Sequence, residues 1–280
     1  MSERVRVRKT YKLYIGGAFP RSESGRTIAV TSPEGDLLAH VARASRKDLR
    51  EAIRAARGAH QAWAERTAYN RGQILYRLAE VVEGRAAQFV DELTSVGVVP
   101  ADARRDVEAA VDGLIYWAGF ADKIEILTGS VNPVAGPFLN VSQAIPLGVC
   151  GLSCRDDGGL AGITGQIGPA LAAANSVVAV AGAPAALVMS TLGEAAATSA
   201  VPAGVLTLLT GEGAALLPWL ADHEDVDLID VTGAPSDLRA DLEARAAENL
   251  KRVVATEGRE DLNAARAFTE IKTVWHPARI

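Results

Sequence analysis

The residues best suited to covalent or acid-base chemistry gather in one short stretch near the middle of the chain. Cys150 and Cys154 could each supply a thiolate nucleophile, and the pair Asp156-Asp157 could bind a metal ion or act as acid and base. No histidine accompanies Cys154 locally, and the carboxylates beside it should raise the pKa of its thiol. We therefore expect both cysteines to be reduced, buried and inert, and both aspartates to belong to a solvated turn before Gly158-Gly159.

A second candidate is a turn that could bind phosphate. Thr210-Gly211-Glu212-Gly213 lies between an apolar segment and a helical one, and backbone N–H groups at such a position can hold a phosphate group. The histidines are scattered without metal-ligand spacing, so we expect no metal site and ordinary surface or packing roles for them. They are His40, His60, His223 and His276.

A parallel sheet would position these groups. Apolar strand candidates alternate with helical segments at residues 149–153, 177–180, 205–209, 227–231 and 252–256. This alternation predicts an α/β fold whose sheet is doubly wound, as in Rossmann domains.

The rest of the chain predicts helices and small sheets around that core. Short strands are expected at 13–19, 27–32 and 37–41, followed by a helix that begins at a capping box formed by Ser45 and Asp48. Apolar stripes indicate further helices over 74–82 and 107–118. Residues 124–145 read as a hairpin, and 268–275, rich in Thr, Ile, Val and aromatics, as a strand.

Composition narrows the classes of partner. The 280 residues are 49% hydrophobic and 22% charged, with a formal net charge of -5 and no basic cluster, so we expect no nucleic-acid partner. Residues 158–193 carry no charge, but Pro169, Asn175 and Pro184 interrupt them, so we expect no membrane span. Residues 1–10 show no secretory pattern, and a cytoplasmic location is expected.

Several motifs resemble the aldehyde dehydrogenase superfamily, over nearly the whole chain. Ile145-Pro146-Leu147-Gly148-Val149 resembles the family's entry into its first Rossmann strand, and Ile167 to Asn175 its next helix and turn. Other matching segments are Val201 to Gly213, Asp225 to Gly233, Glu248 to Val253 and Phe268 to Trp275; the last resembles the family's C-terminal assembly strand.

The resemblance also implies which functional positions have changed. The family uses an Asn for the aldehyde oxyanion, a Lys and a Glu for the adenosine ribose, a Ser near the pyrophosphate and a Glu to activate water. In this sequence those positions hold Asp157, Val180, Ala183, Ala234 and Thr256, while the turn glycines Gly211, Gly213 and Gly233 remain. An ionised carboxylate repels an oxyanion, and threonine is no general base near neutral pH. We therefore predict no catalytic residue and expect no cofactor, with retained NAD binding as the alternative.

The resemblance further implies that a catalytic domain is absent. Family members insert a domain that carries the nucleophilic cysteine between the base-bearing strand and the assembly strand. Here residues 256–261 run almost directly into the assembly strand, which leaves no room for a unit of roughly 100 residues. We expect N-terminal strands and helices over 1–123, a degenerate Rossmann domain over 147–257, and a small antiparallel oligomerisation sheet built from 124–146 and 267–277.

These features predict an assembling subunit. Sheet edges present unpaired donors and acceptors that invite pairing with another chain. We expect a noncatalytic subunit that forms homo-oligomers, or hetero-oligomers with a full-length aldehyde dehydrogenase. The alternatives are an NAD-binding half-enzyme that completes a composite active site with a partner, and a binding protein for another small ligand. The expected interface residues are Leu139, Val141, Ile145, Phe268, Ile271, Val274 and Trp275.

Overall fold

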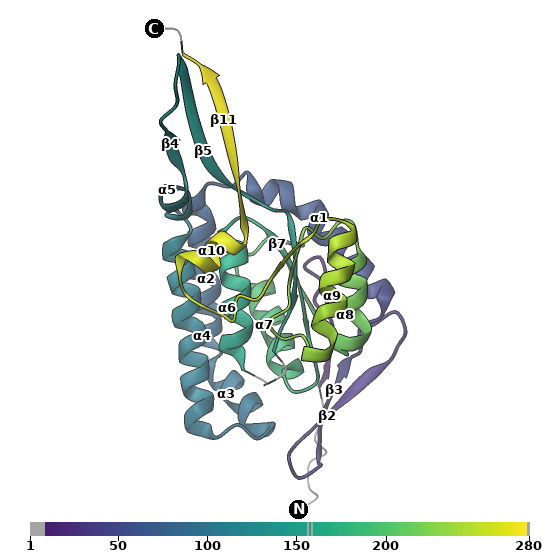
Figure 1. The fold of residues 1–280 in the computed structure, drawn as a ribbon. Helices are drawn as coiled ribbons and strands as arrows, with labels where there is room; N and C mark the ends of the chain where they lie inside the picture. The colour runs from purple at the N-terminus through teal and green to yellow at the C-terminus, as the bar shows by residue number, and fades with distance from the viewer. Residues whose placement is uncertain (1–8, 156, 158, 279–280) are drawn as a thin grey trace, which may run out of the picture.

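A five-stranded parallel sheet forms the centre of the computed structural model, which describes residues 9–155, 157 and 159–278 (Figure 1). Its strands lie in the order β10-β9-β6-β7-β8, and each neighbouring pair is parallel. The first of these strands in the sequence, β6, lies in the middle of the sheet. The next two extend the sheet on one side and the last two on the other, which confirms the doubly wound α/β fold. The strands are β6 (Val149–Ser153), β7 (Ser176–Ala181), β8 (Leu206–Thr210), β9 (Leu228–Asp230) and β10 (Arg252–Val254).

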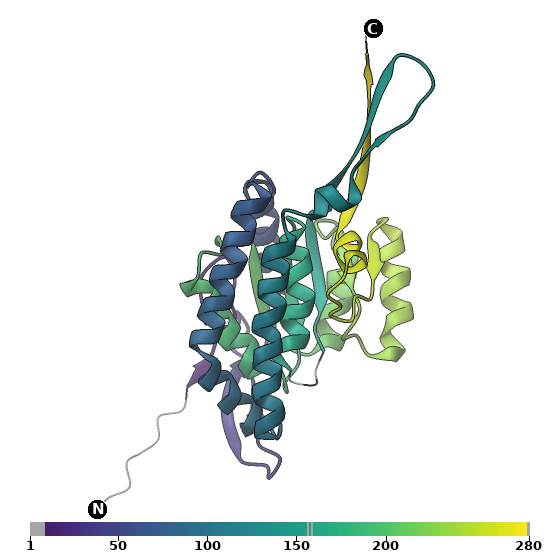
Figure 2. The same cartoon turned by 90° about the vertical axis from the view of Figure 1, so that its left-hand side faces the viewer.

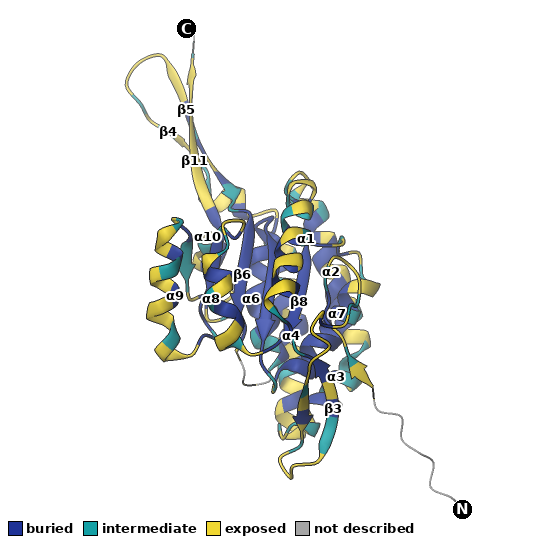
Figure 3. Cartoon of the chain, turned by 90° about the vertical axis from the view of Figure 1, so that its right-hand side faces the viewer, coloured by how far each residue is buried: buried dark blue, intermediate teal, exposed yellow. Residues whose placement is uncertain are grey.

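Helices cover both faces of this sheet, which is why every residue of β6, β7 and β8 is buried. On one face, α6 (Leu160–Ala172) and α7 (Ala186–Thr198) pack against the sheet, and an outer layer packs against these two helices. The outer layer consists of α2 (Ala68–Gly84), α3 (Ala86–Ser95) and α4 (Pro100–Phe120). The other face packs against α1 (Arg46–Ala64), α8 (Gly213–Asp222) and α9 (Ser236–Glu248) (Figure 3).

Helix α1 begins at the expected capping box. The Ser45 hydroxyl accepts from the backbone N–H of Asp48 at 3.3 Å, and the Asp48 carboxylate accepts from the Ser45 N–H at 2.8 Å. Buried Asp48 also accepts a hydrogen bond from Ser22 at 2.7 Å, which ties the helix start to the N-terminal segment. The capping residues thus fix both where α1 begins and how the preceding chain reaches it.

A second, three-stranded sheet forms near the N-terminus from β1 (Thr10–Tyr11), β3 (Leu37–Ala42) and β2 (Thr27–Thr31). The strand predicted over 13–19 is wrong. Gly16 and Gly17 adopt positive φ angles of 59° and 79°, so the chain turns back and Ile15 bonds Ala18 in both directions at 3.0 Å. Only isolated bridges remain there, one of them joining Tyr14 to Leu208 of β8.

A third sheet protrudes from the body (Figures 1 and 2). It consists of β4 (Ser130–Asn132), β5 (Phe138–Pro146) and β11 (Thr269–Pro277), with β5 in the middle. β5 and β11 pair antiparallel along nine residues, from Thr269 opposite Pro146 to Pro277 opposite Phe138. The predicted hairpin and C-terminal strand are confirmed, except that Ile124–Thr128 forms a short helix, α5, where extended chain was expected.

Helix α10 (Leu262–Ala267) leads into β11 and changes one predicted interface residue. Phe268 is fully buried in the core of its own chain, so it does not belong to the exposed set. By contrast Leu139, Ile271, Val274 and Trp275 are between 43% and 57% exposed, and Val141 and Ile145 are partly buried. The protruding sheet therefore carries large apolar side chains in contact with solvent, together with Val131 and Phe138.

The length and composition of the helices decide whether any of them could span a membrane. Within the described part of the chain, none of them combines the length and the apolar character that crossing a lipid bilayer requires.

Candidate functional site

The carboxyl ends of the five parallel strands meet at one edge of the sheet, which is where α/β proteins place their ligands. Most of the site positions predicted from the sequence lie on the segments that follow these strand ends. Backbone hydrogen bonds join the ends directly: Cys154 N–H donates to Val180, Gly211 N–H to Ala181 and Gly233 N–H to Ser153, at 2.9 to 3.0 Å. The structure thus brings the predicted positions together in space.

Cys150 lies near the start of β6, and Cys154 directly follows the end of this strand. Cys150 is fully buried within the strand, and burial raises the pKa of its thiol well above the ordinary value, with Asp227 and Asp230 adding to the rise. Cys154 is 2% exposed. A buried thiol held in its protonated form is a poor nucleophile, so Cys150 is unsuited to covalent catalysis.

The turn after β6 carries the acidic position that the sequence singled out. Asp157 is exposed and forms an ion pair with Arg155 at 2.6 Å. Its neighbours Asp156 and Gly158 lie outside the described residues.

A carboxylate from another helix, Asp106 of α4, caps the start of α6. It accepts from the backbone N–H of Leu160 at 2.6 Å. Burial raises the pKa of Asp106, and the nearby charge of Asp157 raises it further, while its backbone hydrogen bonds oppose the rise. No local sequence pattern marks Asp106 as a cap, because its partners lie 54 and 55 positions away.

A cavity of about 450 Å³ opens beside this turn. Four carboxylates and one guanidinium contribute to its lining, so the cavity has an excess of negative charge. Such a surface disfavours a developing oxyanion or a pyrophosphate. The charged residues are Asp102, Asp106, Arg155, Asp157 and Glu257.

The ends of β7 and β8 offer few polar side chains. Val180 is 2% exposed and Ala183 is partly buried, and neither can bind a ribose hydroxyl. Gly211 is buried and Gly213 begins α8. The adjacent Thr210 hydroxyl donates to Ala42 at 2.6 Å, so it serves the fold and not a ligand.

The ends of β9 and β10 are joined by a buried polar cluster around Asp230. This fully buried carboxylate accepts from the backbone N–H and the hydroxyl of Thr232, at 2.8 and 2.5 Å, and from the hydroxyl of Thr256. The Thr256 hydroxyl is thus occupied by a structural hydrogen bond. Ala234 is 5% exposed; its backbone N–H donates to the Val231 carbonyl at 3.0 Å and its own carbonyl accepts from Arg239 at 3.3 Å.

Gly233 contacts the end of β6 through bare backbone. A Cβ atom placed on it would lie 2.2 Å from the carbonyl oxygen of Cys154. Packing between the two strand ends therefore requires a glycine at position 233, whether or not a ligand binds there.

The side chains present do not fit a dinucleotide well. Gly211 and Gly233 pack against neighbouring protein atoms, and Val180, Ala183 and Ala234 provide no polar side-chain group for a ribose or pyrophosphate. Among the residues that the structure describes, no three His, Cys, Asp or Glu side chains gather closely enough to hold a metal ion.

Comparison with known proteins identifies the relatives of this chain. Residues 19–267 match the model of the "Aldehyde dehydrogenase family". A cytosolic aldehyde dehydrogenase 1 of Elephantulus edwardii is 32% identical over 255 residues, which cover 89% of this chain and 50% of that protein.

Solved structures of aldehyde dehydrogenases are also similar to this chain. A putative aldehyde dehydrogenase from Burkholderia cenocepacia superposes with a TM-score of 0.80 at 32% identity, covering 87% of this chain and 50% of that one. PnpE, solved in complex with nicotinamide adenine dinucleotide, gives a TM-score of 0.78 at 30% identity, with 87% and 50% covered. The chain thus spans about half the length of the relatives it matches.

Proposed function

Because this chain belongs to the aldehyde dehydrogenase family, we propose that it is a noncatalytic member that assembles with itself or with a full-length aldehyde dehydrogenase, as a scaffold or regulator. The proposal rests mainly on the short connection between β10 and β11. Residues 255–268 join the two strands and contain only the six-residue helix α10. They leave no space for a domain that could carry a nucleophilic cysteine.

The protruding sheet supports the assembly part of the proposal. β11 is the edge strand of its sheet, and residues 270–277 are exposed along its length. An edge strand with exposed Ile271, Val274 and Trp275 offers both backbone hydrogen-bonding groups and apolar contacts to another chain.

Size-exclusion chromatography with light scattering tests this proposal. The purified chain is run alone and after mixing with a full-length family member from the same organism. Oligomers of the chain, or a defined complex with the longer protein, would support it. A monomer in both experiments would contradict it, as would NAD reduction by the chain alone with an aldehyde.

A second candidate is an NAD-binding half-enzyme that completes a composite active site with a partner. The retained turn glycines and the NAD complex of the relative PnpE favour it. Calorimetric titration with NAD separates the two: low-micromolar affinity supports the half-enzyme, and millimolar or absent binding supports the noncatalytic subunit.

A further inference from the structure

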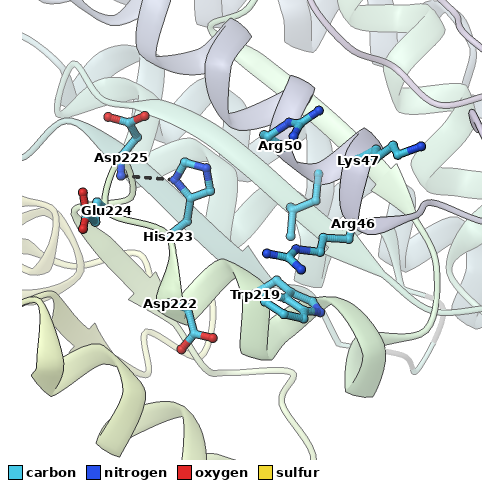
Figure 4. A pocket seen from close by; sticks show the side chains of 9 residues that line it. Arg46, Lys47, Arg50, Trp219, Asp222, His223, Glu224 and Asp225 are labelled. Carbon is cyan, nitrogen blue, oxygen red and sulfur yellow. Dashed lines mark hydrogen bonds between the residues drawn. The ribbon is translucent and has the colours of Figure 1, made fainter.

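A cavity of about 690 Å³ lies between the first turns of α1 and the C-terminal end of α8, and its lining includes none of the strand-end positions described above. Figure 4 shows its lining side chains, with Arg46 extended across Trp219. Its size is in the range of pockets that bind small molecules. Positive charge comes from α1, and negative charge comes from the last residue of α8 and the loop that follows it.

Two arginines of α1 form the positive wall. Arg46 and Arg50 are one helical turn apart and so share a face of the helix. The Arg46 guanidinium lies 3.5 Å from the centroid of the Trp219 ring, and it has no ion pair with a carboxylate among the described residues. Stacking uses the flat face of the guanidinium and leaves its N–H edges available for an anion.

The other charges nearby are already occupied or weakly placed. Lys47 pairs with Glu23 at 3.1 Å, so it is not counted as a ligand-binding group. Arg50 has only a 3.8 Å contact with Glu51. Among the described residues, Arg46 and Arg50 are therefore the cations of this cavity without a close carboxylate partner, and guanidinium N–H groups match the oxygens of a phosphate.

The negative wall contains Asp222, Glu224 and Asp225, with His223 between them. Asp222 pairs with Arg245 at 2.9 Å, and Asp225 lies 3.8 Å from Arg57, but carboxylates keep further acceptor sites for hydroxyl groups. His223 accepts a hydrogen bond from the Asp225 N–H at 3.2 Å, and burial lowers its pKa, which favours the neutral ring. These acids disfavour a polyphosphate or a nucleic acid, because each extra negative charge would be repelled.

We propose that this cavity binds a phosphate monoester of a hydroxylated small molecule, with its phosphate on Arg46 and Arg50 and its hydroxyl groups on the acidic loop. Both walls of the cavity support this proposal: the arginines can bind a single phosphate, and the carboxylates can accept hydrogen bonds from hydroxyl groups. Trp219 holds the Arg46 guanidinium in place and offers an apolar surface to the carbon skeleton. The proposal stands independently of the proposed function.

Calorimetric titration of the full chain with ribose 5-phosphate tests it, with inorganic phosphate and ribose as partial probes. We expect saturable binding of ribose 5-phosphate at least tenfold tighter than that of either fragment. Arg46→Ala and Arg50→Ala should each weaken it roughly tenfold. Arg54→Ala is the matched control, because Arg54 lies one turn further along α1, pairs with Glu51 at 2.9 Å and does not line the cavity.

Three results would overturn the proposal. They are no binding of ribose 5-phosphate at millimolar concentration, equally tight binding of inorganic phosphate, and loss of affinity in Arg54→Ala equal to that in Arg46→Ala. Circular dichroism spectra of the variants, matched to that of the parent chain, would assign a lost affinity to the site and not to unfolding.

Discussion

The hydroxyl of Thr256 donates a hydrogen bond to the buried carboxylate of Asp230, and this contact joins the ends of the neighbouring strands β9 and β10. The backbone N–H of Glu257 donates to Thr232 at 3.1 Å in the same cluster. Position 256 thus supports the sheet edge. A glutamate there would place a second carboxylate next to Asp230, and two neighbouring negative charges repel each other.

Replacing Thr256 with valine should destabilise the fold by about 2 kcal/mol, because a fully buried carboxylate loses one of its hydrogen bonds. Urea unfolding of the variant measures the change. Thr198→Val is the control, since its hydroxyl bonds only helix carbonyls at an exposed position and its loss should cost about 0.5 kcal/mol or less. Equal stability of the two variants would show that the Thr256 contact has no structural role.

The sequence predicts the parallel sheet, but no sequence pattern predicts the polar cluster around Asp230. Strands such as β7, SVVAVA, are apolar throughout because both faces are covered, and that signal is local. Asp230 bonds Thr256, which follows β10, and Asp106 bonds Leu160 of α6; these partners are 26 and 54 positions away, and such contacts depend on tertiary packing. The Arg46–Trp219 stack, across 173 positions by residue number, escapes a local reading for the same reason.

The errors near the ends of the sheets also have physical causes. Residues 13–19 contain apolar and aromatic side chains typical of a strand, but two successive glycines with positive φ reverse the chain instead. At α5 the apolar segment predicts extended chain, but the Leu127 N–H donates to the Lys123 carbonyl at 2.9 Å in a helical turn. The sequence pattern predicts a strand that includes Phe268, but β11 begins one residue later, at Thr269.

Gly233 and Gly213 should respond differently to substitution by alanine. Gly233→Ala would force a Cβ against the Cys154 and Arg155 backbone and should destabilise the chain by about 2 kcal/mol or more. Gly213→Ala meets only Leu217 at 3.4 Å, at the start of α8, and should be neutral or stabilising by at most about 1 kcal/mol. Thermal unfolding compares the two. Equal effects would mean that backbone contact does not explain the glycine at 233.

Lys251 predicts a pH dependence of stability. Burial lowers its pKa to about 8 from 10.5, while its ammonium donates to the carbonyls of His223, at 2.9 Å, and Val226. Between these two pKa values the unfolded chain binds more protons than the folded one, so this residue makes stability rise with pH over that window. The rise should be smaller in Lys251→Met than in the parent chain and in the exposed-site control Lys12→Met, as measured by urea unfolding at pH 7.5 to 10.5. Identical slopes in all three proteins would contradict the assignment.

The exposed edge of β11 predicts how assembly should be disrupted. Val274 is 43% exposed on the protruding sheet, opposite Val141 of β5, so a glutamate there would place a charge in any contact made by this face. Val274→Glu should shift the chain from oligomer toward monomer in light scattering, because burying an unpaired carboxylate disfavours association. Val99→Glu, with 59% exposure at the start of α4, is the matched control and should leave the oligomer intact. If both variants keep the oligomeric state of the parent chain, the protruding sheet is not its interface, and another surface must hold the subunits together.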